Sequence, residues 1–305
     1  MFQELFVPGL ALSLIANVAA CSFTNDEPEW VTPAVRAPLR TALDDRACPD
    51  EDQDTADARR AIARARAMVA LPPMRCDAAA SGAAAGHCRY LITNGELTHF
   101  QTTGRPAFTA VTFEARLALQ RFSELPAGEV IANITGAAAV EGPRGFLNSV
   151  YHRAPFLRTE SSSFGYGHID ACATIDFGRK TEDARAPERV VVWPPDGSKN
   201  VPAVFYAAAE RPNPVPGRSL VGYPVSLIRE SALVALSAEI QGPAGVLDAV
   251  LVTAKTDPEH LVRPGEAHLV PTAPLLPYTE YRVRFSFRSK GEEEAIQTSF
   301  ITGGE

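Results

Sequence analysis

The apolar and polar residues of this chain follow one periodicity in its first part and another in its later part. In the first part, apolar residues recur at helical spacing between capping residues and Gly or Pro. Asp77 can cap the start of an alanine-rich helix, and Gly95 can end it in the left-handed conformation. The segments that this spacing predicts to be helical are 54–70, 77–95, 113–122 and 141–150.

The later part of the chain has the pattern of strands. Short runs rich in β-branched and aromatic residues are separated by Pro, Gly and Asp, which favour turns. Two such runs, 163–170 and 172–178, close the first part. The others are 189–195, 201–208, 222–228, 232–240, 245–252, 266–272, 279–287 and 296–303. Short strands at this spacing predict a β-sandwich, in which Tyr278 or Tyr281 is the corner tyrosine before a late strand.

These patterns predict an α+β chain with two folded domains, which is consistent with its length of 305 residues. The charged stretch 179–189 separates them, so we place the first domain at 55–180 and the second at 187–305. Residues 22–54 are rich in Pro, Asp and Glu and have little periodicity, which predicts an acidic linker. The formal net charge is -7 and no segment is strongly basic, which argues against a nucleic-acid-binding protein.

The first 21 residues have the composition of an export signal. They form an apolar run that ends in small residues, and they are too short for an ordinary membrane-spanning helix. Their end, Val18-Ala19-Ala20-Cys21, resembles the lipobox of bacterial lipoproteins, which implies cleavage before Cys21 and its lipidation. A cleaved secretory signal with a chance cysteine is the alternative, because the lipobox-like pattern is short. Glu4 and the lack of Lys or Arg before the apolar run depart from the usual export signal.

A lipidated Cys21 implies a location outside the cytoplasm. Several acyl chains on one residue, at ~0.8 kcal/mol per buried methylene, suffice for stable anchoring. Ser22 rather than Asp follows the cysteine, so we expect a membrane-anchored lipoprotein of the outer membrane or cell surface.

Two disulfide bonds are predicted from the other cysteines, which are Cys48, Cys76, Cys88 and Cys172. They are even in number, in a chain expected to reach an oxidising compartment. The sequence leaves all three pairings open, and each bond would add ~2 to 4 kcal/mol by constraining the unfolded chain. A four-cysteine zinc site is the alternative, although no pair has the C-x2-C spacing of such sites.

A series of short motifs runs through residues 55–178. In chain order they are LPPM, HCRYL, NGELTHF, GEVIAN, NSVYHR and FGYG. Their order and spacing resemble the bacterial form of the CAP superfamily, named for cysteine-rich secretory proteins, antigen five and plant pathogenesis-related proteins. The resemblance implies an α-β-α sandwich whose central cleft gathers two His and two acidic residues.

Matched motif by motif, the resemblance assigns three residues to this cleft, which are His99, Glu129 and His152. No residue matches the second acidic position: Ser149 lies nearest to the expected place, and Glu141 is further upstream. The family's usual Ser-Pro-Gly-His-Arg is here Ser-Val-Tyr-His-Arg, at 149–153, and Val130 replaces a usual Asn.

Two neutral imidazoles and one carboxylate are compatible with three roles. They can hold zinc or another divalent cation with an open position, act as general acid and base around a small ligand, or form a hydrogen-bond network between helix ends and a sheet. No serine or cysteine nucleophile with a supporting base is evident, because the SSSFG stretch lacks the strand-to-helix turn that such a serine needs. His87 is predicted to be a packed or capping residue, with contact to the cleft as the alternative.

We therefore expect a lipid-anchored, extracytoplasmic binding or scaffolding protein. Its second domain resembles the Ig-like or fibronectin-like modules that accompany CAP domains in some bacterial surface proteins. The expected partners are the membrane, through the lipid anchor, and a small ligand or an envelope component; no nucleic acid is expected. One alternative is a metal-dependent hydrolase acting on peptide, lipid or cell-wall polymer. Another makes the β-sandwich the recognition module.

Overall fold

The helices of the first part lie largely where the sequence predicts them. The computed structural model describes residues 46–181, 189–289 and 291–304. Asp77 accepts a hydrogen bond at the start of the second helix, and Gly95 ends it with a φ of 65°, as predicted. The helices are α1 (Gln53–Met68), α2 (Ala78–Asn94), α3 (Phe113–Leu119), α4 (Gly136–Glu141) and α5 (Ala154–Leu157), with a short 3-10 helix η1 (Phe146–Asn148).

The fourth predicted helix, over 141–150, is wrong. This stretch holds the last residue of α4 and the short η1, with a turn between them. Pro143 has no amide hydrogen to donate to a helix. A Cβ on Gly142 or Gly145 would crowd the Ala138 carbonyl, so the turn folds back too tightly for a continuous helix.

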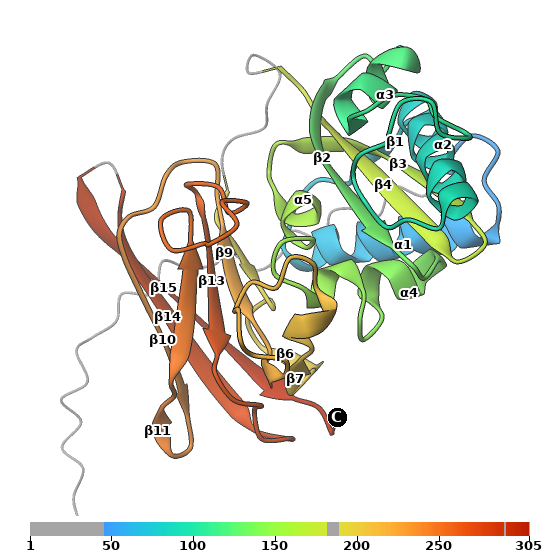
Figure 1. Cartoon of the computed structure of the whole chain (residues 1–305). Coiled ribbons are helices and arrows are strands. Elements are labelled where there is room, and N and C mark those ends of the chain that lie inside the picture. Colours follow the sequence, from blue (N-terminus) through green and yellow to red (C-terminus); the bar gives the residue numbers. More distant parts are fainter. Residues whose placement is uncertain (1–45, 182–188, 290, 305) are drawn as a thin grey trace, which may run out of the picture. The chain divides into compact units, whose positions relative to one another are not determined.

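A four-stranded sheet lies between the helices of the first part (Figure 1). Its order is β1-β3-β4-β2, and its strands are β1 (Arg75–Cys76), β2 (Leu125–Ala132), β3 (Ser161–Ile169) and β4 (Cys172–Arg179). The last two strands confirm the sequence pattern. The strand β2 is not predicted, because Pro126 and Gly128 interrupt its alternation of apolar and polar residues.

The two faces of this sheet differ in composition. One face presents large apolar side chains such as Phe164, Ile175 and Phe177, which join the main core together with residues of α1. The opposite face carries Gly165 and Gly167, where an added Cβ would overlap the backbone of α2. Helix α2 therefore lies closer to β3 than any strand side chain would allow.

Two disulfide bonds join the four predicted cysteines. Cys48 is bonded to Cys76, which ties the first described residues to β1, and Cys88 is bonded to Cys172, which ties α2 to β4. Of the three pairings that the sequence leaves open, the structure therefore shows Cys48–Cys76 with Cys88–Cys172. The alternative of a four-cysteine zinc site is wrong, because all four sulfurs are in disulfides. Cys48 lies in the predicted linker 22–54, of which the structure describes only the end.

The later part of the chain is rich in strands, so the α+β class is confirmed. One sheet has the order β11-β10-β14-β15-β6, a second has the order β12-β13-β9-β5, and β7 pairs with β8. The Tyr281 hydroxyl accepts a hydrogen bond from the Leu276 amide at 2.8 Å, and its role as a corner tyrosine stays a prediction. The strands are β5 (Val191–Trp193), β6 (Ser198–Val201), β7 (Val204–Phe205), β8 (Val221–Gly222), β9 (Val225–Ile228), β10 (Val234–Gly242), β11 (Gly245–Val246), β12 (Ala249–Thr253), β13 (Glu266–Pro271), β14 (Glu280–Ser289) and β15 (Glu292–Thr302), with the 3-10 helix η3 at Ala207–Ala209.

The main cluster of buried apolar residues contains members of both parts, for example Phe177 of β4 and Phe285 of β14. The described residues all belong to one compact unit. The division into domains at 55–180 and 187–305 stays a prediction. Among the helices of the described residues, none is long and apolar enough to cross a membrane.

The close approach of α2 to β3 predicts that Gly165→Ala is severely destabilising. The added Cβ would overlap the backbone of Ala80 and Ser81, which no side-chain movement relieves. We expect the free energy of unfolding in urea to fall by about 3 kcal/mol or more. In the control Gly86→Ala, the new Cβ would lie 3.7 Å from Thr109, an ordinary contact, and helix propensity should add up to about 1 kcal/mol. Equal stabilities of the two variants would refute the close approach.

Candidate functional site

A cluster of polar side chains occupies the sheet face that α2 covers. Glu129 of β2 and Asp176 of β4 are directly opposite each other, and Gly165 of β3 is opposite Asp176 on its other side. Opposite residues of an antiparallel pair point to the same face of a sheet. Both carboxyl groups therefore lie on the face where Gly165 allows α2 to approach.

Glu129 is the centre of this cluster, and its side chain is only 1% exposed. Its Oε1 lies 2.8 Å from His99 Nδ1 and 3.9 Å from His87 Nε2, and Arg116 of α3 donates to its Oε2. Burial by itself would raise the pKa of Glu129. The hydrogen bond from His99 and the neighbouring His87 and Arg116 outweigh burial and hold this pKa below its usual value.

His99 is the member of the cluster that reaches solvent. Its side chain is 44% exposed, while its Nδ1 is bonded to Glu129. Arg116 also donates to the His99 carbonyl oxygen, at 3.2 and 3.3 Å, so that ring and backbone are both fixed. In the described residues no hydrogen bond engages Nε2, which makes it the ring atom that can contact a ligand.

His87 is a buried, neutral member of the cluster. Its Nε2 lies 2.9 Å from the Thr98 carbonyl oxygen, and Gln101 donates to its Nδ1 at 3.0 Å. These partners assign the ring proton to Nε2, because a carbonyl oxygen can only accept. Burial lowers the pKa of His87 to about 4. The predicted packed role is therefore confirmed, and the ring also lies beside Glu129.

Asp176 is a second acidic residue of the cluster, which the sequence motifs do not reveal. It is fully buried, and within the described part of the chain no N–H or O–H group donates to its carboxyl oxygens, so its polar neighbour is the Glu129 carboxylate, to which a protonated Asp176 can donate. Burial, followed by the nearby charge of Glu129, raises the pKa of Asp176 well above its usual value. The sequence feature that could have revealed Asp176 is the alternation along its strand, which puts Thr174 and Asp176 on one face of the sheet and Ile175 and Phe177 on the other.

The structure places His152 in a different network. Its Nδ1 lies 2.9 Å from Oε1 of Glu210, and the amides of Val150, Tyr151 and His152 donate to the same carboxylate. Burial would raise the pKa of Glu210, but the hydrogen bonds from the His152 ring and from these amides leave it lowered. Nothing in the sequence around Glu210 predicts this contact.

Tyr151 joins the same turn to a second carboxylate. Its hydroxyl donates to Oδ1 of Asp257 at 2.6 Å, and Asp257 also accepts hydrogen bonds from the amides of Leu261 and Val262. Arg153, fully buried, donates to the Pro224 carbonyl oxygen at 2.7 Å. The turn that contains His152 is thus hydrogen-bonded to residues of the β-rich part of the chain.

Of the three predicted cleft residues, the structure brings together His99 and Glu129 and leaves His152 with Glu210. This donor set does not fit a resident zinc or other divalent cation. Both oxygens of Glu129 accept hydrogen bonds, one of them from the Arg116 guanidinium, which a cation would have to displace. In the parts of the chain that the structure describes, no three His, Cys, Asp or Glu side chains are grouped to hold a metal.

The predicted lipidation site, Cys21, lies outside the described residues, so lipidation stays a prediction.

Comparison with known proteins gives only distant likenesses. No family model and no curated protein matches the chain. One similar structure is an extracellular protein containing an SCP domain from Bacillus anthracis str. Ames, with 24% identity, 42% of this chain and 41% of that chain covered, and a TM-score of 0.36. Another is PcoC, a copper resistance protein from Escherichia coli, with 14% identity, 36% and 94% covered, and a TM-score of 0.24. The chain spans less than half of the first protein, and both TM-scores are too low to establish its fold.

The burial of Asp176 predicts a pH dependence of stability that Asp176→Asn removes. An unfolded Asp has a pKa of about 3.9, whereas the folded pKa is raised, so the folded state binds the proton more tightly. The contribution of Asp176 to stability is therefore largest below the unfolded pKa and falls as pH rises toward the folded value, by about 1.4 kcal/mol per pH unit.

The measurement is the free energy of unfolding in urea at a series of pH values. We expect the stability of the wild type relative to that of Asp176→Asn to fall with this slope as pH rises. Groups such as His87, whose lowered pKa contributes an opposite slope, are present in both proteins and cancel in the difference. Asp170→Asn, exposed on the same β3–β4 hairpin, should keep the wild-type slope. The same slope in the wild type and in Asp176→Asn would show that Asp176 does not carry it.

Proposed function

We propose that this chain is a lipid-anchored, extracytoplasmic protein of the CAP type that acts by binding or scaffolding rather than by catalysis. In this proposal the β-rich part is an Ig-like module. The lipobox-like sequence that ends at Cys21 supports the anchor. The Cys48–Cys76 and Cys88–Cys172 bonds support an oxidising compartment, because disulfides are rare where thiols are kept reduced.

The observation that carries the binding role is that the two imidazoles are hydrogen-bonded to different carboxylates. His99 is bonded to Glu129, and His152 is bonded to Glu210. A hydrolase that used both rings would need them at one reacting bond, because general acid and base must each lie within hydrogen-bond reach of it. Each ring is instead part of its own hydrogen-bond network.

The half-exposed His99 is the contact point that the proposal assigns to a small ligand or an envelope component. Its orientation is fixed from the buried side by Glu129 and Arg116, so binding would not have to order the ring. The Nε2 atom can donate to an acceptor or accept from a donor according to its protonation. Such a site suits recognition of a polar group without transformation of it.

The contacts of residues 149–158 support a scaffolding role for the β-rich part. Glu210 accepts the amides of the turn, and Arg158 is paired with Glu266 at 2.7 Å, with both side chains buried. Removing one partner of a buried pair typically costs several kcal/mol, because it leaves an uncompensated charge. These residues therefore form a fixed junction with the β strands rather than a loose connection.

A double-mutant cycle of His99→Ala and His152→Ala tests whether the two networks are separate. We expect the two losses in the free energy of unfolding to add to within about 0.5 kcal/mol, as for independent sites. As a positive control, His99→Ala combined with Glu129→Gln should be non-additive, since these side chains are in contact. Zinc should not raise the urea midpoint of the wild type. Strong coupling of the two histidines, or a zinc effect that the double variant lacks, would favour a shared metal centre.

The lipid anchor predicts that Cys21→Ala moves the protein from the membrane fraction to the soluble fraction. We expect wild-type processing to be sensitive to globomycin and the variant to be insensitive. Ser22→Ala leaves the cysteine intact and should remain membrane-bound. The measurement is immunoblotting of membrane and soluble fractions, and a soluble wild-type protein would end the lipoprotein hypothesis.

A further inference from the structure

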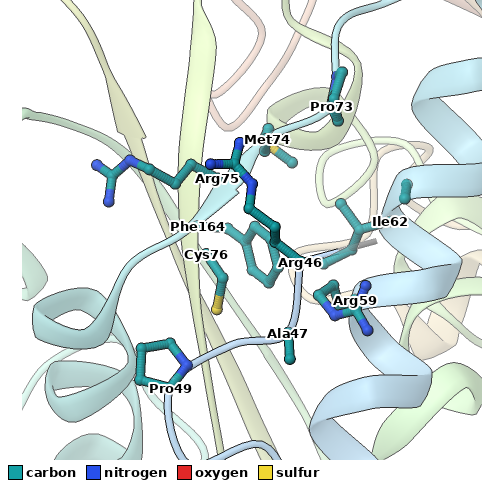
Figure 2. Close-up of a pocket in the computed structure, with 11 residues that line it drawn as sticks. Arg46, Ala47, Pro49, Arg59, Ile62, Pro73, Met74, Arg75, Cys76 and Phe164 are labelled. Carbon is teal, nitrogen blue, oxygen red and sulfur yellow. The ribbon is translucent and has the colours of Figure 1, made fainter. Parts of the chain in front are cut away.

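The arginines that line the cavity shown in Figure 2 all have partners within the chain. The cavity measures about 210 Å3 and is lined by residues of α1, β1 and β3, among others. Arg59 of α1 is bonded to both oxygens of Glu51. Arg75 of β1 is paired with Asp77 and Glu124. A buried polar group with unused bonding capacity lies instead on the opposite face of the sheet, which α2 covers.

This group is the carboxyl group of Asp176 in β4. It is fully buried, and among the described residues no N–H or O–H group donates to it. Directly opposite, on β2, lies Glu129, whose side chain is on the same face of the sheet. Two carboxyl groups can form a hydrogen bond with each other only when one of them carries a proton.

The neighbours of the two carboxyl groups determine which of them carries this proton. Glu129 accepts from the His99 ring at 2.8 Å and from the buried guanidinium of Arg116, and both stabilise its charge. Asp176 is closer to repulsion than to support, because Glu129 and Glu114 both disfavour its charge and only Arg116 favours it. The proton therefore resides on Asp176, and its O–H group donates to Glu129.

The Glu129 carboxylate then has three donors from three parts of the fold. Asp176 donates from β4, Arg116 from α3, and His99 from the segment after α2. The two oxygens of a carboxylate together offer about four acceptor positions, so all three donors can be accommodated. Each donor lowers the basicity of the carboxylate and so weakens its pull on the other two.

We propose that Asp176 is a positioning residue for His99 and acts through Glu129 as a neutral acid. Its O–H group takes one acceptor position of Glu129 and thereby limits the strength of the His99–Glu129 hydrogen bond. The Nδ1 proton of His99 stays on the ring, and Nε2 remains on the solvent side. The inference rests on the proposed function only for the role of His99 as the contact point for a ligand.

The test is nuclear magnetic resonance of the full-length chain with 15N-labelled histidine. The Nδ1 proton of His99 is assigned by its loss in His99→Gln. Asp176→Leu keeps nearly the same shape without a donor, so Glu129 should pull harder on this proton and its signal should move downfield. Asp176→Asn keeps both shape and donor and should leave the signal near its wild-type position.

Asp170→Asn, on the exposed end of the same hairpin, is the matched control and should not move the signal. Both Asp176 variants fill the space, and neither changes the charge of a neutral acid, so a purely structural role would not separate them. An unmoved signal in Asp176→Leu, or equal shifts in Asp176→Leu and Asp176→Asn, would overturn the proposal.

Infrared spectroscopy of the wild type tests the proposal even if Asp176→Leu does not fold. We expect a carboxylic-acid band that persists at neutral pH and disappears in Asp176→Asn. In Glu129→Gln the band should move to higher frequency, because the O–H group loses its charged acceptor. A wild type without this band at neutral pH contradicts the proposal. Neither measurement uses a ligand, so failure of the proposed binding function would leave both results unchanged.

Discussion

The approach of α2 to β3 at Gly165 and Gly167 determines much of the rest of this structure. Without side chains at these two positions, the helix backbone lies directly on the strand. This distance brings Cys88 to Cys172 and excludes water from Asp176 on the neighbouring strand. A charge in such a place is unfavourable, so the helix position and the raised pKa of Asp176 have one physical cause.

The buried charges of the Glu129 cluster are balanced. Glu129 is held ionised by its neighbours and faces the buried guanidinium of Arg116, while burial keeps His87 neutral. The favoured protonation of Asp176 adds no further charge to this low-dielectric space. The cluster can therefore be fully enclosed except at His99, whose side chain reaches solvent.

Features that depend on neighbouring residues could be predicted from the sequence. The caps of α2 at Asp77 and Gly95 are local, as is the alternation that reveals β4. The number of disulfides followed from the cysteine count, whereas their pairing depends on which strands and helices meet. The approach of His99 to Glu129 was expected only from the order of motifs, since 30 residues separate them and spacing alone implies no contact.

Other features depend on contacts between segments that are far apart in the sequence, and no local sequence pattern predicts them. Glu210 lies about 60 residues from the turn that it binds, in a stretch with no recognisable motif. Asp176 becomes a member of the cluster only through its register opposite Glu129. The strand β2 was missed because Pro126 and Gly128 obscure its pattern, although its hydrogen bonds to β4 tolerate an irregularity there.

The hydrogen bonds of Glu210 to residues 150–152 offer a physical reason for the unusual sequence of this turn. Three of the four hydrogen bonds come from backbone amides, so the Glu210 carboxylate contacts mainly the main chain of this turn rather than its side chains. Proline, which the similar motif carries where this chain has Val150, lacks an amide hydrogen and could not make the first of these bonds. The departure from the similar motif at Val150 therefore goes together with the binding of this turn by Glu210, a residue of the same chain.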